Sequence, residues 1–289
     1  MKVLLTGADG QVGKSLARSA DPAIALLATT RPQLDIADAN QVDRVVADAS
    51  PDLIINAAAY TAVDRAETEP EQAHAVNETG VANLAAAAAR CGARLIHIST
   101  DFVFDGRSAS PYRPDDTPAP LGVYGASKLA GEQAALATLQ DNAVTLRTAW
   151  VYASRGHNFV LTMLRLMHEH GSVRVVSDQI GSPTASHSIA DAIWAISARP
   201  ELNGIYHWTD SGVASWYDFA VAVSEEALSC GLLSSPVTVS PIATEDYPTA
   251  AQRPSYSVLD TRTTIDAIGI SPLYWRSNLR NVLKEIKLG

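Results

Sequence analysis

A tyrosine and a lysine stand four residues apart near the middle of the chain, at Tyr124 and Lys128. On a helix this spacing places both side chains on one face. A phenol can transfer a proton during catalysis, but its ordinary pKa near about 10 must fall toward neutrality, a change worth about 4 kcal/mol. We expect a partly desolvated Lys128 ammonium to supply that stabilisation. The pair predicts a proton-transfer site, although an exposed tyrosine and a solvated lysine can have the same spacing by chance.

A third polar group, Thr100, ends an apolar run at Leu95–Ser99 that predicts a buried strand. In open α/β sheets, ligands bind beyond the carboxyl ends of the strands. A hydroxyl at that point can donate to a substrate carbonyl oxygen as the oxygen gains negative charge. We therefore predict that Thr100 is catalytic together with Tyr124 and Lys128. The alternative, that the side chain only caps the following turn, applies more to Asp101 than to Thr100.

Three glycines follow the first apolar run, Val3–Thr6, at three-residue spacing: Gly7, Gly10 and Gly13. At the first strand-to-helix turn, small residues allow backbone N–H groups and the helix N-terminus to approach a pyrophosphate. A tight turn without a ligand can use the same glycines, but the position after the first strand favours dinucleotide binding. The loop predicts a nicotinamide dinucleotide as the cofactor.

The second apolar run, Ile24–Ala28, is followed by Arg31 and by no carboxylate before Asp35. An acidic residue at the strand end would bind the adenine ribose 2′-hydroxyl of NAD and repel the extra phosphate of NADP, whereas Arg31 can pair with that phosphate. We predict NADPH as the cofactor, with NADH as an alternative. Arg31 can equally be a solvated loop cation. Asp35 and Ile36 can hold the adenine by one hydrogen bond and one apolar contact.

Short apolar runs alternate with helical patterns in the first half of the chain, which is typical of a parallel sheet covered by helices. Strands are predicted at Val3–Thr6, Ile24–Ala28, Leu53–Asn56, Leu95–Ser99 and Val144–Arg147. Helices are predicted at Gln11–Ala20, Ala39–Ala49, Glu71–Arg90 and Tyr124–Leu139. We predict an α/β fold with a Rossmann-type doubly wound parallel sheet, whose NAD(P)-binding domain covers residues 1–150.

Beyond about Trp150 the elements become shorter and prolines interrupt them, which predicts a smaller substrate-binding domain over residues 151–289. Helices are predicted at His157–His170, Ser186–Ala198, Trp216–Leu228 and Trp275–Lys284. One strand-like run, Gly204–Trp208, is expected to return to the main sheet. The two domains are therefore expected to interleave along the chain.

The composition excludes several classes of protein. The chain has 289 residues and a formal net charge of −9, with 22 basic against 31 acidic residues and 47% hydrophobic residues. Neither nucleic acid nor an anionic membrane is an expected partner, because there is no basic run and acidic residues are in excess. Two distant cysteines, Cys91 and Cys230, support neither a disulfide scaffold nor a zinc site. No apolar stretch reaches the length of a membrane span, so we expect a cytoplasmic protein.

Several motifs together resemble the extended short-chain dehydrogenase/reductase superfamily and, within it, the dTDP-4-dehydrorhamnose reductase family. Besides the glycine loop and the Tyr124/Lys128 pair, the motifs are Asn56–Asp64, Val76–Asn77, Ser99–Gly106, Arg147–Tyr152, Asn158–Phe159, Asp178–Thr184 and Arg253–Leu259. They extend over nearly the whole chain, including the half expected to bind substrate. The resemblance implies NAD(P)H-dependent reduction of the C4 keto group of dTDP-4-dehydrorhamnose to give dTDP-L-rhamnose.

The resemblance also implies roles for single residues. Those implied to bind the cofactor are Gly10, Gln11 and Val12 at the pyrophosphate, Asp35 and Ile36 at the adenosine, Ala59, Tyr60 and Thr61 toward the nicotinamide, and Tyr124 and Lys128 at the nicotinamide ribose. Those implied to bind the nucleotide sugar are Thr100, Asp101 and Trp150, with Val63 at the wall of its pocket. From its type alone, Trp150 would be a core aromatic after a strand.

In one respect the chain departs from the family it resembles. Some members are dimers bridged by magnesium through acidic side chains on the first helix and after the Gly-x-Pro-Thr segment. Ser15 and His187 occupy the matching positions, and neither is the hard oxygen anion that Mg²⁺ prefers. We therefore expect no such metal site, and a monomer or a homodimer that forms in another way.

Three alternative functions remain open at this point. A nucleotide-sugar 4,6-dehydratase would carry an acid after Asp101, where this chain has Phe102, and an epimerase that retains NAD would carry an acid after the second strand. A non-catalytic NADP-binding subunit, such as the regulatory β subunit of methionine adenosyltransferase, resembles the chain as well. The complete set of Tyr124, Lys128 and Thr100 favours catalysis.

Overall fold

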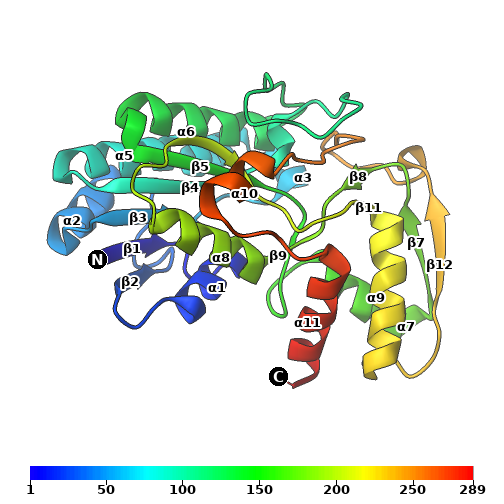
Figure 1. The fold of residues 1–289 in the computed structure, drawn as a ribbon. Coiled ribbons are helices and arrows are strands. Elements are labelled where there is room, and N and C mark those ends of the chain that lie inside the picture. Colours follow the sequence, from blue (N-terminus) through cyan, green and yellow to red (C-terminus); the bar gives the residue numbers. More distant parts are fainter. Residues whose placement is uncertain (289) are drawn as a thin grey trace.

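A six-stranded parallel sheet forms the centre of the protein, whose computed structural model describes residues 1–288 (Figure 1). Its strands are β1 (Lys2–Thr6), β2 (Ala25–Thr29), β3 (Leu53–Asn56), β4 (Arg94–Thr100), β5 (Ala143–Thr148) and β10 (Gly204–His207). They are ordered β10-β5-β4-β3-β1-β2, and every neighbouring pair is parallel. The doubly wound α/β fold predicted from the sequence is therefore confirmed.

Helices cover both faces of this sheet, because its strands carry apolar side chains on both sides. They are α1 (Gln11–Ser19), α2 (Ala39–Ala49), α5 (Gly80–Cys91), α6 (Val123–Leu139) and α8 (Ser186–Ser197). Leu4 packs into the core beneath α2, α5 and α6, whereas Val3 and Leu5 pack into the core beneath α1 and α8. Alternate residues of one strand point to opposite faces, so each layer receives every second side chain.

The strand order reverses between β1 and β3. The chain leaves β1 through α1 toward β2 on one side, and β3, β4 and β5 follow on the other side. Ligands of doubly wound sheets bind at the carboxyl ends of the strands beside such a reversal. The glycine loop follows β1 and Thr100 ends β4, so the fold brings two of the predicted site segments to that edge.

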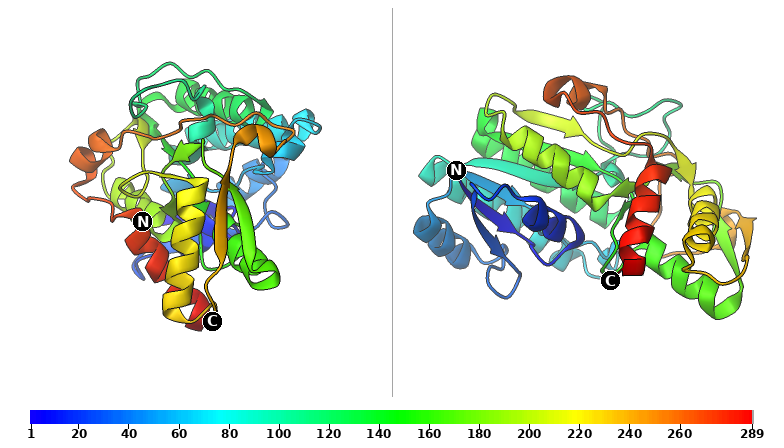
Figure 2. Two further views of the ribbon diagram at one scale, coloured as in Figure 1. Left: turned by 90° about the vertical axis from the view of Figure 1, so that its right-hand side faces the viewer. Right: turned by 60° about the horizontal axis from the view of Figure 1, so that its bottom comes forward.

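A second unit with its own apolar core adjoins this edge (Figure 2). Its main elements are α7 (Phe159–His170), β7 (Ser172–Val176), α9 (Trp216–Cys230), β12 (Thr238–Ile242) and α11 (Trp275–Leu288). Short paired strands complete it: β6 (Val151–Tyr152), β8 (Ile180–Gly181), β9 (Thr184–Ala185) and β11 (Ala214–Ser215). The strand predicted at Gly204–Trp208 forms as β10 and pairs with β5 in the main sheet.

The helix predicted over Glu71–Arg90 is interrupted. α4 (Pro70–His74) continues into a π-helix over Ala75–Thr79 before α5 begins at Gly80. Asn77, which lies in the π-helix, forms hydrogen bonds through its side chain to the backbone N–H and C=O of Tyr60. The interruption therefore coincides with a contact to the loop after β3, a tertiary interaction that helical periodicity does not reveal.

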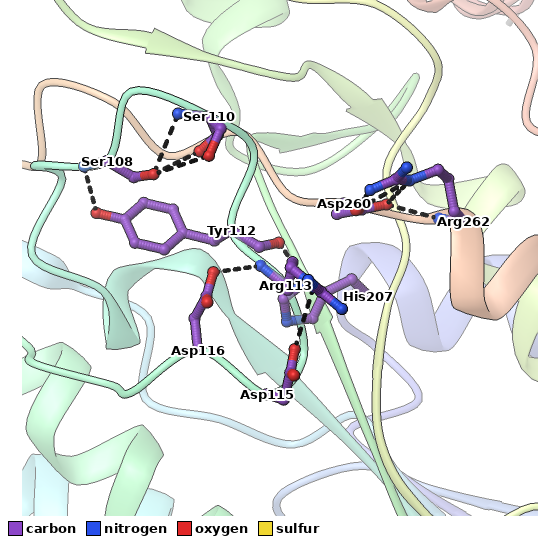
Figure 3. A network of polar contacts seen from close by, with 9 residues as sticks. All are labelled: Ser108, Ser110, Tyr112, Arg113, Asp115, Asp116, His207, Asp260 and Arg262. Atoms are coloured by element: carbon purple, nitrogen blue, oxygen red, sulfur yellow. Dashed lines mark hydrogen bonds and ion pairs between the residues drawn. The ribbon is translucent and has the colours of Figure 1, made fainter.

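A polar network holds the long connection between β4 and α6 against β10 and the segment around Leu259 (Figure 3). The Tyr112 hydroxyl accepts from the Ser108 N–H, and the Tyr112 carbonyl accepts from His207 Nδ1 at 3.0 Å. Arg113 pairs with Asp115, while the backbone of Tyr112 bridges to Leu259. The remaining elements are α3 (Val63–Ala66), α10 (Arg262–Ile268) and 3-10 helices at Asp101–Val103, Gln140–Asn142 and Thr244–Asp246. Within residues 1–288, no helix is both long and apolar enough to span a bilayer.

Candidate active site

A cavity of about 550 Å³ opens where the glycine loop, the end of β4 and the start of α6 meet. The predicted site residues that line it are Gly10, Gln11, Val12, Ala59, Thr61, Val63, Thr100, Asp101, Tyr124, Lys128 and Trp150. Val151, Gly156 and His157 of the second predicted half also line it, so both halves of the chain face one space. The three residues predicted to be catalytic are part of this lining.

Helix α6 carries two of these three residues. The N-cap of α6, Gly122, provides no side-chain cap, but Glu67 Oε1 accepts from the Val123 N–H at 2.9 Å and binds the first turn. Tyr124 and Lys128 lie one turn apart on the helix, as their spacing predicts, and both line the cavity. Glu67 was not identified from the sequence, because it precedes the helix by more than fifty residues.

The expectation that Lys128 lowers the pKa of Tyr124 is wrong for this structure. Burial raises the pKa of the Tyr124 phenol to about 12, with Thr100 lowering it and the Asp101 carboxylate raising it by smaller amounts. The cause is that a phenol largely shielded from solvent is more stable uncharged, and Lys128 does not offset this effect. A protonated phenol is also the form that can donate a proton to a substrate.

The Lys128 side chain is buried, with an exposed fraction of 2%, and points toward β4. Its Nζ donates to the Ile98 carbonyl at 2.6 Å and lies 3.3 Å from His97 Nε2. Burial lowers the pKa of Lys128 to about 8, and the Glu132 carboxylate partly opposes this effect. Lys128 is therefore a group that can gain or lose a proton near neutral pH.

Thr100 caps the turn after β4 in addition to facing the cavity. Its Oγ1 accepts from the Phe102 N–H at 3.2 Å and donates to Asp101 Oδ1 at 3.0 Å. The expectation that Asp101, more than Thr100, caps this turn is therefore wrong. Before the Thr100 hydroxyl can donate to a substrate oxygen, it must turn away from Asp101.

Asp101 is buried and keeps one carboxylate oxygen, Oδ2, without a hydrogen-bond partner. Burial raises the pKa of Asp101 to about 6, although hydrogen bonds from Ser257 and Thr100 lower it. Two more unpartnered hydroxyls, Ser99 Oγ and Thr148 Oγ1, belong to residues that line the same cavity. Buried polar atoms without partners are rare in folded proteins, and three in one cavity are suited to a polar ligand.

The glycines of the first turn have different tasks. A Cβ on Gly7, whose φ is +66°, would lie 2.6 Å from the Ala58 nitrogen, and a Cβ on Gly13 would lie 2.1 Å from the Gly7 carbonyl oxygen. These two glycines therefore permit close packing and do not line the cavity. Gly10 lines it, and the first turn of α1 has no side-chain cap, which leaves backbone N–H groups suited to a pyrophosphate.

The residues predicted near the adenosine lie outside the cavity lining. Arg31 is exposed and its Nε lies 3.4 Å from Asp35 Oδ2. Ile36 is buried beside α5, where a Cβ on Gly80 would meet its side chain. Tyr60 also lies away from the cavity lining and donates its hydroxyl to Glu69 Oε2 at 2.7 Å.

Trp150 has an unusual backbone conformation at the boundary between the two units. Its φ of +49° lies in the left-handed region, which residues other than glycine seldom adopt. The indole stacks on Trp216 with ring centroids 3.5 Å apart and also lies against Gly181, where a Cβ would approach it to 2.4 Å. The sequence identified Trp150 but not its partner Trp216, since the two are distant in the chain.

Comparison with known proteins agrees with this geometry. The family model described as RmlD substrate binding domain matches residues 1–288. The chain belongs to this family. Among its relatives, a spore coat polysaccharide biosynthesis protein of Bacillus subtilis, SpsK, is 42% identical over 98% of this chain and 97% of its own length. A dTDP-4-dehydrorhamnose reductase of Aggregatibacter actinomycetemcomitans is 42% identical over 97% of this chain and 98% of its own length.

A solved member with a ligand has the same fold. The dTDP-4-dehydrorhamnose reductase of Bacillus anthracis, solved in complex with NADP, is 37% identical and superposes with a TM-score of 0.91 over 98% of this chain and 99% of its own. The resemblance predicted from the motifs is thus confirmed for nearly the full length of this RmlD-family chain.

Proposed function

We propose that the chain is an NAD(P)H-dependent dTDP-4-dehydrorhamnose reductase, which reduces the C4 keto group of dTDP-4-dehydro-β-L-rhamnose to give dTDP-L-rhamnose. Its relatives of that name match over almost their whole length. The observation that carries the proposal is the single cavity that Tyr124, Lys128, Thr100 and the glycine loop line together. A phenolic proton donor and a pyrophosphate-binding turn in one cavity fit the reduction of a carbonyl by a dinucleotide.

The residues present fit NADPH. The uncapped first turn of α1 and Gly10 can receive the pyrophosphate, and Ser99 and Thr148, which line the cavity, carry unpartnered hydroxyls. When bound, the cofactor supplies the hydride. Arg31, Asp35, Ile36 and Tyr60 are proposed to serve the adenosine and nearby parts of the cofactor from outside the cavity.

The protein side chains supply the proton and orient the sugar. Tyr124 is protonated at neutral pH and can donate to the oxygen that becomes the alcohol. Thr100, turned from Asp101, would polarise the same oxygen, and Lys128 would return a proton to Tyr124. Trp150 offers a flat apolar face and Asp101 Oδ2 a free acceptor for the nucleotide sugar.

The alternative functions fit the cavity less well. A dehydratase needs a second acid near Asp101, but the next residue, Phe102, packs edge-on against the Tyr124 ring with centroids 5.5 Å apart. A purely regulatory NADP-binding protein needs neither a phenol nor a buried lysine in the cavity. Both observations support a reductase.

Replacing Tyr124→Phe tests the proposal. We expect the variant to bind NADPH as wild type does and to lose about two or more orders of magnitude in turnover of dTDP-4-dehydro-β-L-rhamnose, since the proton donor is removed. The assay follows NADPH absorbance with and without the sugar nucleotide. Tyr274→Phe, which removes the hydroxyl of an exposed tyrosine, is the control. Wild-type turnover in the Tyr124 variant would exclude Tyr124 from the mechanism.

We also propose the division, assembly and location of the chain. Residues 1–150 serve the cofactor and residues 151–289 chiefly the substrate. Ser15 Oγ lies 2.8 Å from Ser186 Oγ and His187 Nε2 lies 3.1 Å from Asn278 Oδ1, so these two positions are not suited to bridge a magnesium-linked dimer. Two free cysteines are compatible with a cytoplasmic location, where thiols stay reduced.

A further inference from the structure

A row of buried polar side chains runs behind Lys128, away from the cavity. It comprises Thr6, Asn56 and His97, on β1, β3 and β4, and each has an exposed fraction of 0%. Thr6 Oγ1 donates to Asn56 Oδ1 at 2.7 Å, Asn56 Nδ2 lies 3.0 Å from His97 Nδ1, and His97 Nε2 lies 3.3 Å from Lys128 Nζ. Of these residues, only Lys128 lines the cavity, and the proposed mechanism does not use the others.

The backbone fixes the direction of the hydrogen bonds in this row. The Ala58 N–H donates to Asn56 Oδ1 at 3.1 Å. A backbone N–H can only donate, so the oxygen of the Asn56 amide must face Ala58 and Thr6. The Asn56 NH₂ group therefore faces His97, and His97 Nδ1 must accept from it.

A histidine whose Nδ1 accepts must carry its proton on Nε2 when it is neutral. Burial keeps the pKa of His97 well below its ordinary value, with the Lys128 charge acting in the same direction. The neutral ring thus points an Nε2–H toward Lys128 Nζ. An ammonium has no lone pair to accept that hydrogen, whereas an uncharged amine has one.

We propose that His97 is a positioning residue for Lys128, whose Nε2–H favours the uncharged amine and so eases release of the lysine proton toward Tyr124. The inference rests on the proposed reductase function for its catalytic meaning. The hydrogen-bond pattern itself does not depend on that function. In each cycle Tyr124 gives one proton to the sugar oxygen, and Lys128 gives one proton back to Tyr124 and becomes an amine until solvent restores it.

Glu132, Tyr124 and Asp101 are other titratable groups near Lys128. Glu132 lies one turn further along α6 and favours the ammonium, but its carboxylate is held by Arg147 of β5 in two-pronged contacts of 2.6 and 2.9 Å. Tyr124 and Asp101 share the cavity lining with the lysine. On the side away from the cavity, His97 directs a ring nitrogen at Nζ.

The first test measures the protonation state of the His97 ring directly and needs no substrate. In protein labelled with ¹⁵N-histidine, two-bond ¹H–¹⁵N correlations show which ring nitrogen carries the proton, and the His97→Leu spectrum assigns the resonance. We expect a neutral His97 protonated on Nε2 from mildly acidic to mildly alkaline pH. A ring protonated on Nδ1, or an imidazolium that titrates in this range, would overturn the proposal.

The second test reads Lys128 through the pH dependence of kcat. If the ammonium must supply a proton, kcat falls as pH rises through the Lys128 pKa. Removing the Nε2–H in His97→Leu should raise that pKa. The fall of kcat at alkaline pH, here called the alkaline limb, should then move to higher pH by about one unit. Asn56→Asp should do the same, because a carboxylate would draw the proton to Nδ1 and leave Nε2 as an acceptor.

Thr6→Val is the matched control. It removes a hydroxyl from the same buried row, but the Ala58 N–H still fixes the Asn56 amide. We expect Thr6→Val to lose stability while keeping both the His97 tautomer and the alkaline limb. A limb that stays in place in His97→Leu and Asn56→Asp, or moves equally in Thr6→Val, refutes the positioning role. A wild-type protein inactive on the sugar nucleotide would refute the proposed function instead, and the tautomer test would still apply.

Discussion

Asp101 combines a role in the cavity with a cost to the fold. The carboxyl is buried, with one oxygen unpartnered, and burial raises its pKa from an ordinary value of 3.8 to about 6. A carboxyl whose pKa is higher in the folded state stabilises the fold below its unfolded pKa, and this contribution is lost as pH rises through the folded pKa. Above about pH 6 the ionised Asp101 therefore weakens the protein.

Replacing Asp101→Asn should remove this cost. We expect the variant to be more stable than wild type at pH 8 by on the order of 2–3 kcal/mol, and the difference to vanish toward pH 4, since the neutral acid and the amide are similar. Urea unfolding at both pH values measures it.

Asp105→Asn is the control for this prediction. Its pKa is lowered by hydrogen bonds from the Tyr112 hydroxyl and the Arg107 N–H, so the change should destabilise the protein at neutral pH, with the effect shrinking as pH falls. A stability difference for Asp101→Asn that does not depend on pH would contradict the prediction.

Other residues of the cavity also lower the stability of the folded protein. Trp150 occupies a left-handed conformation that costs about 1–3 kcal/mol in residues other than glycine. Ser99 and Thr148 keep buried hydroxyls without partners. Strain and unsatisfied groups that gather in one cavity indicate selection for ligand binding over stability.

Between elements, a buried ion pair joins α6 to β5. Arg147 and Glu132 form an ion pair at 2.6 Å with side-chain exposures of 1% each. Arg147 also lies over the Phe104 ring, 5.1 Å from its centroid. Tyr124 and Lys128 lie on α6, so the Arg147–Glu132 ion pair helps to fix their position relative to the sheet.

Breaking this pair should be costly. We expect Arg147→Ala to destabilise the protein by about 3–5 kcal/mol, because it leaves the Glu132 charge buried without a partner. The double variant Arg147→Met/Glu132→Leu should recover most of that loss, since no buried charge remains. Arg165→Ala is the control: it breaks an exposed pair with Glu169 on α7 and should change stability by about 0.5 kcal/mol or less. Denaturant unfolding of all four proteins decides, and a double variant no more stable than Arg147→Ala would refute the explanation.

Local patterns were sufficient to predict the elements of the main sheet. Leu53–Asn56 and Ala39–Ala49 form with the predicted bounds, and the helix predicted at Tyr124 begins one residue earlier. β7 and β12 were not predicted, although they pair with each other over five residues. Their pairing joins segments more than sixty residues apart, and Pro241 within β12 argues against a strand from sequence alone.

The same distinction holds for the site. The glycine loop, Thr100 and the Tyr124/Lys128 pair are local motifs, and the cavity includes residues from each of them. The His97 contact with Lys128, the Trp216 stack on Trp150 and the Glu67 cap of α6 escaped prediction. Each of these contacts joins residues that are distant in the sequence and meet only in the tertiary fold. Neither helical periodicity nor residue spacing could therefore predict them.

At the scale of the whole molecule, two polar contacts connect the cofactor half with the second half beside the cavity. Gln11 Oε1, in the first turn of α1, accepts from Asn158 Nδ2 at 2.9 Å. Asp64, next to Val63 of the cavity lining, accepts from Arg253 at 2.7 and 3.1 Å and from the Ala251 N–H at 3.1 Å. Arg253 lowers the pKa of Asp64 through its hydrogen bonds.

The segment that Arg253 anchors lies beside Asp101, a residue of the cavity lining. Ser255 Oγ donates to the Gly106 carbonyl at 3.0 Å, and a hydrogen bond from Ser257 lowers the pKa of Asp101. Residues 251–257 therefore link α3, the loop after β4 and Asp101 of the cavity lining. Freeing one end of this segment should disturb the sugar site and spare the glycine loop, which lies on the first strand-to-helix turn.

Arg253→Ala should therefore weaken binding of the sugar nucleotide while leaving binding of NADPH nearly unchanged. We expect its KM for the sugar nucleotide to rise about 10-fold or more, the equivalent of one lost charge-assisted hydrogen bond of about 1.5–3 kcal/mol, while its Kd for NADPH changes less than about twofold. Arg262→Ala is the control, because the exposed Arg262 side chain pairs with Asp260, two residues away in the chain. Steady-state kinetics and NADPH fluorescence titration measure the two constants. Equal losses for both ligands would mean that the segment supports the whole cavity, and an unchanged KM would mean that the Asp64–Arg253 pair has no part in holding the sugar.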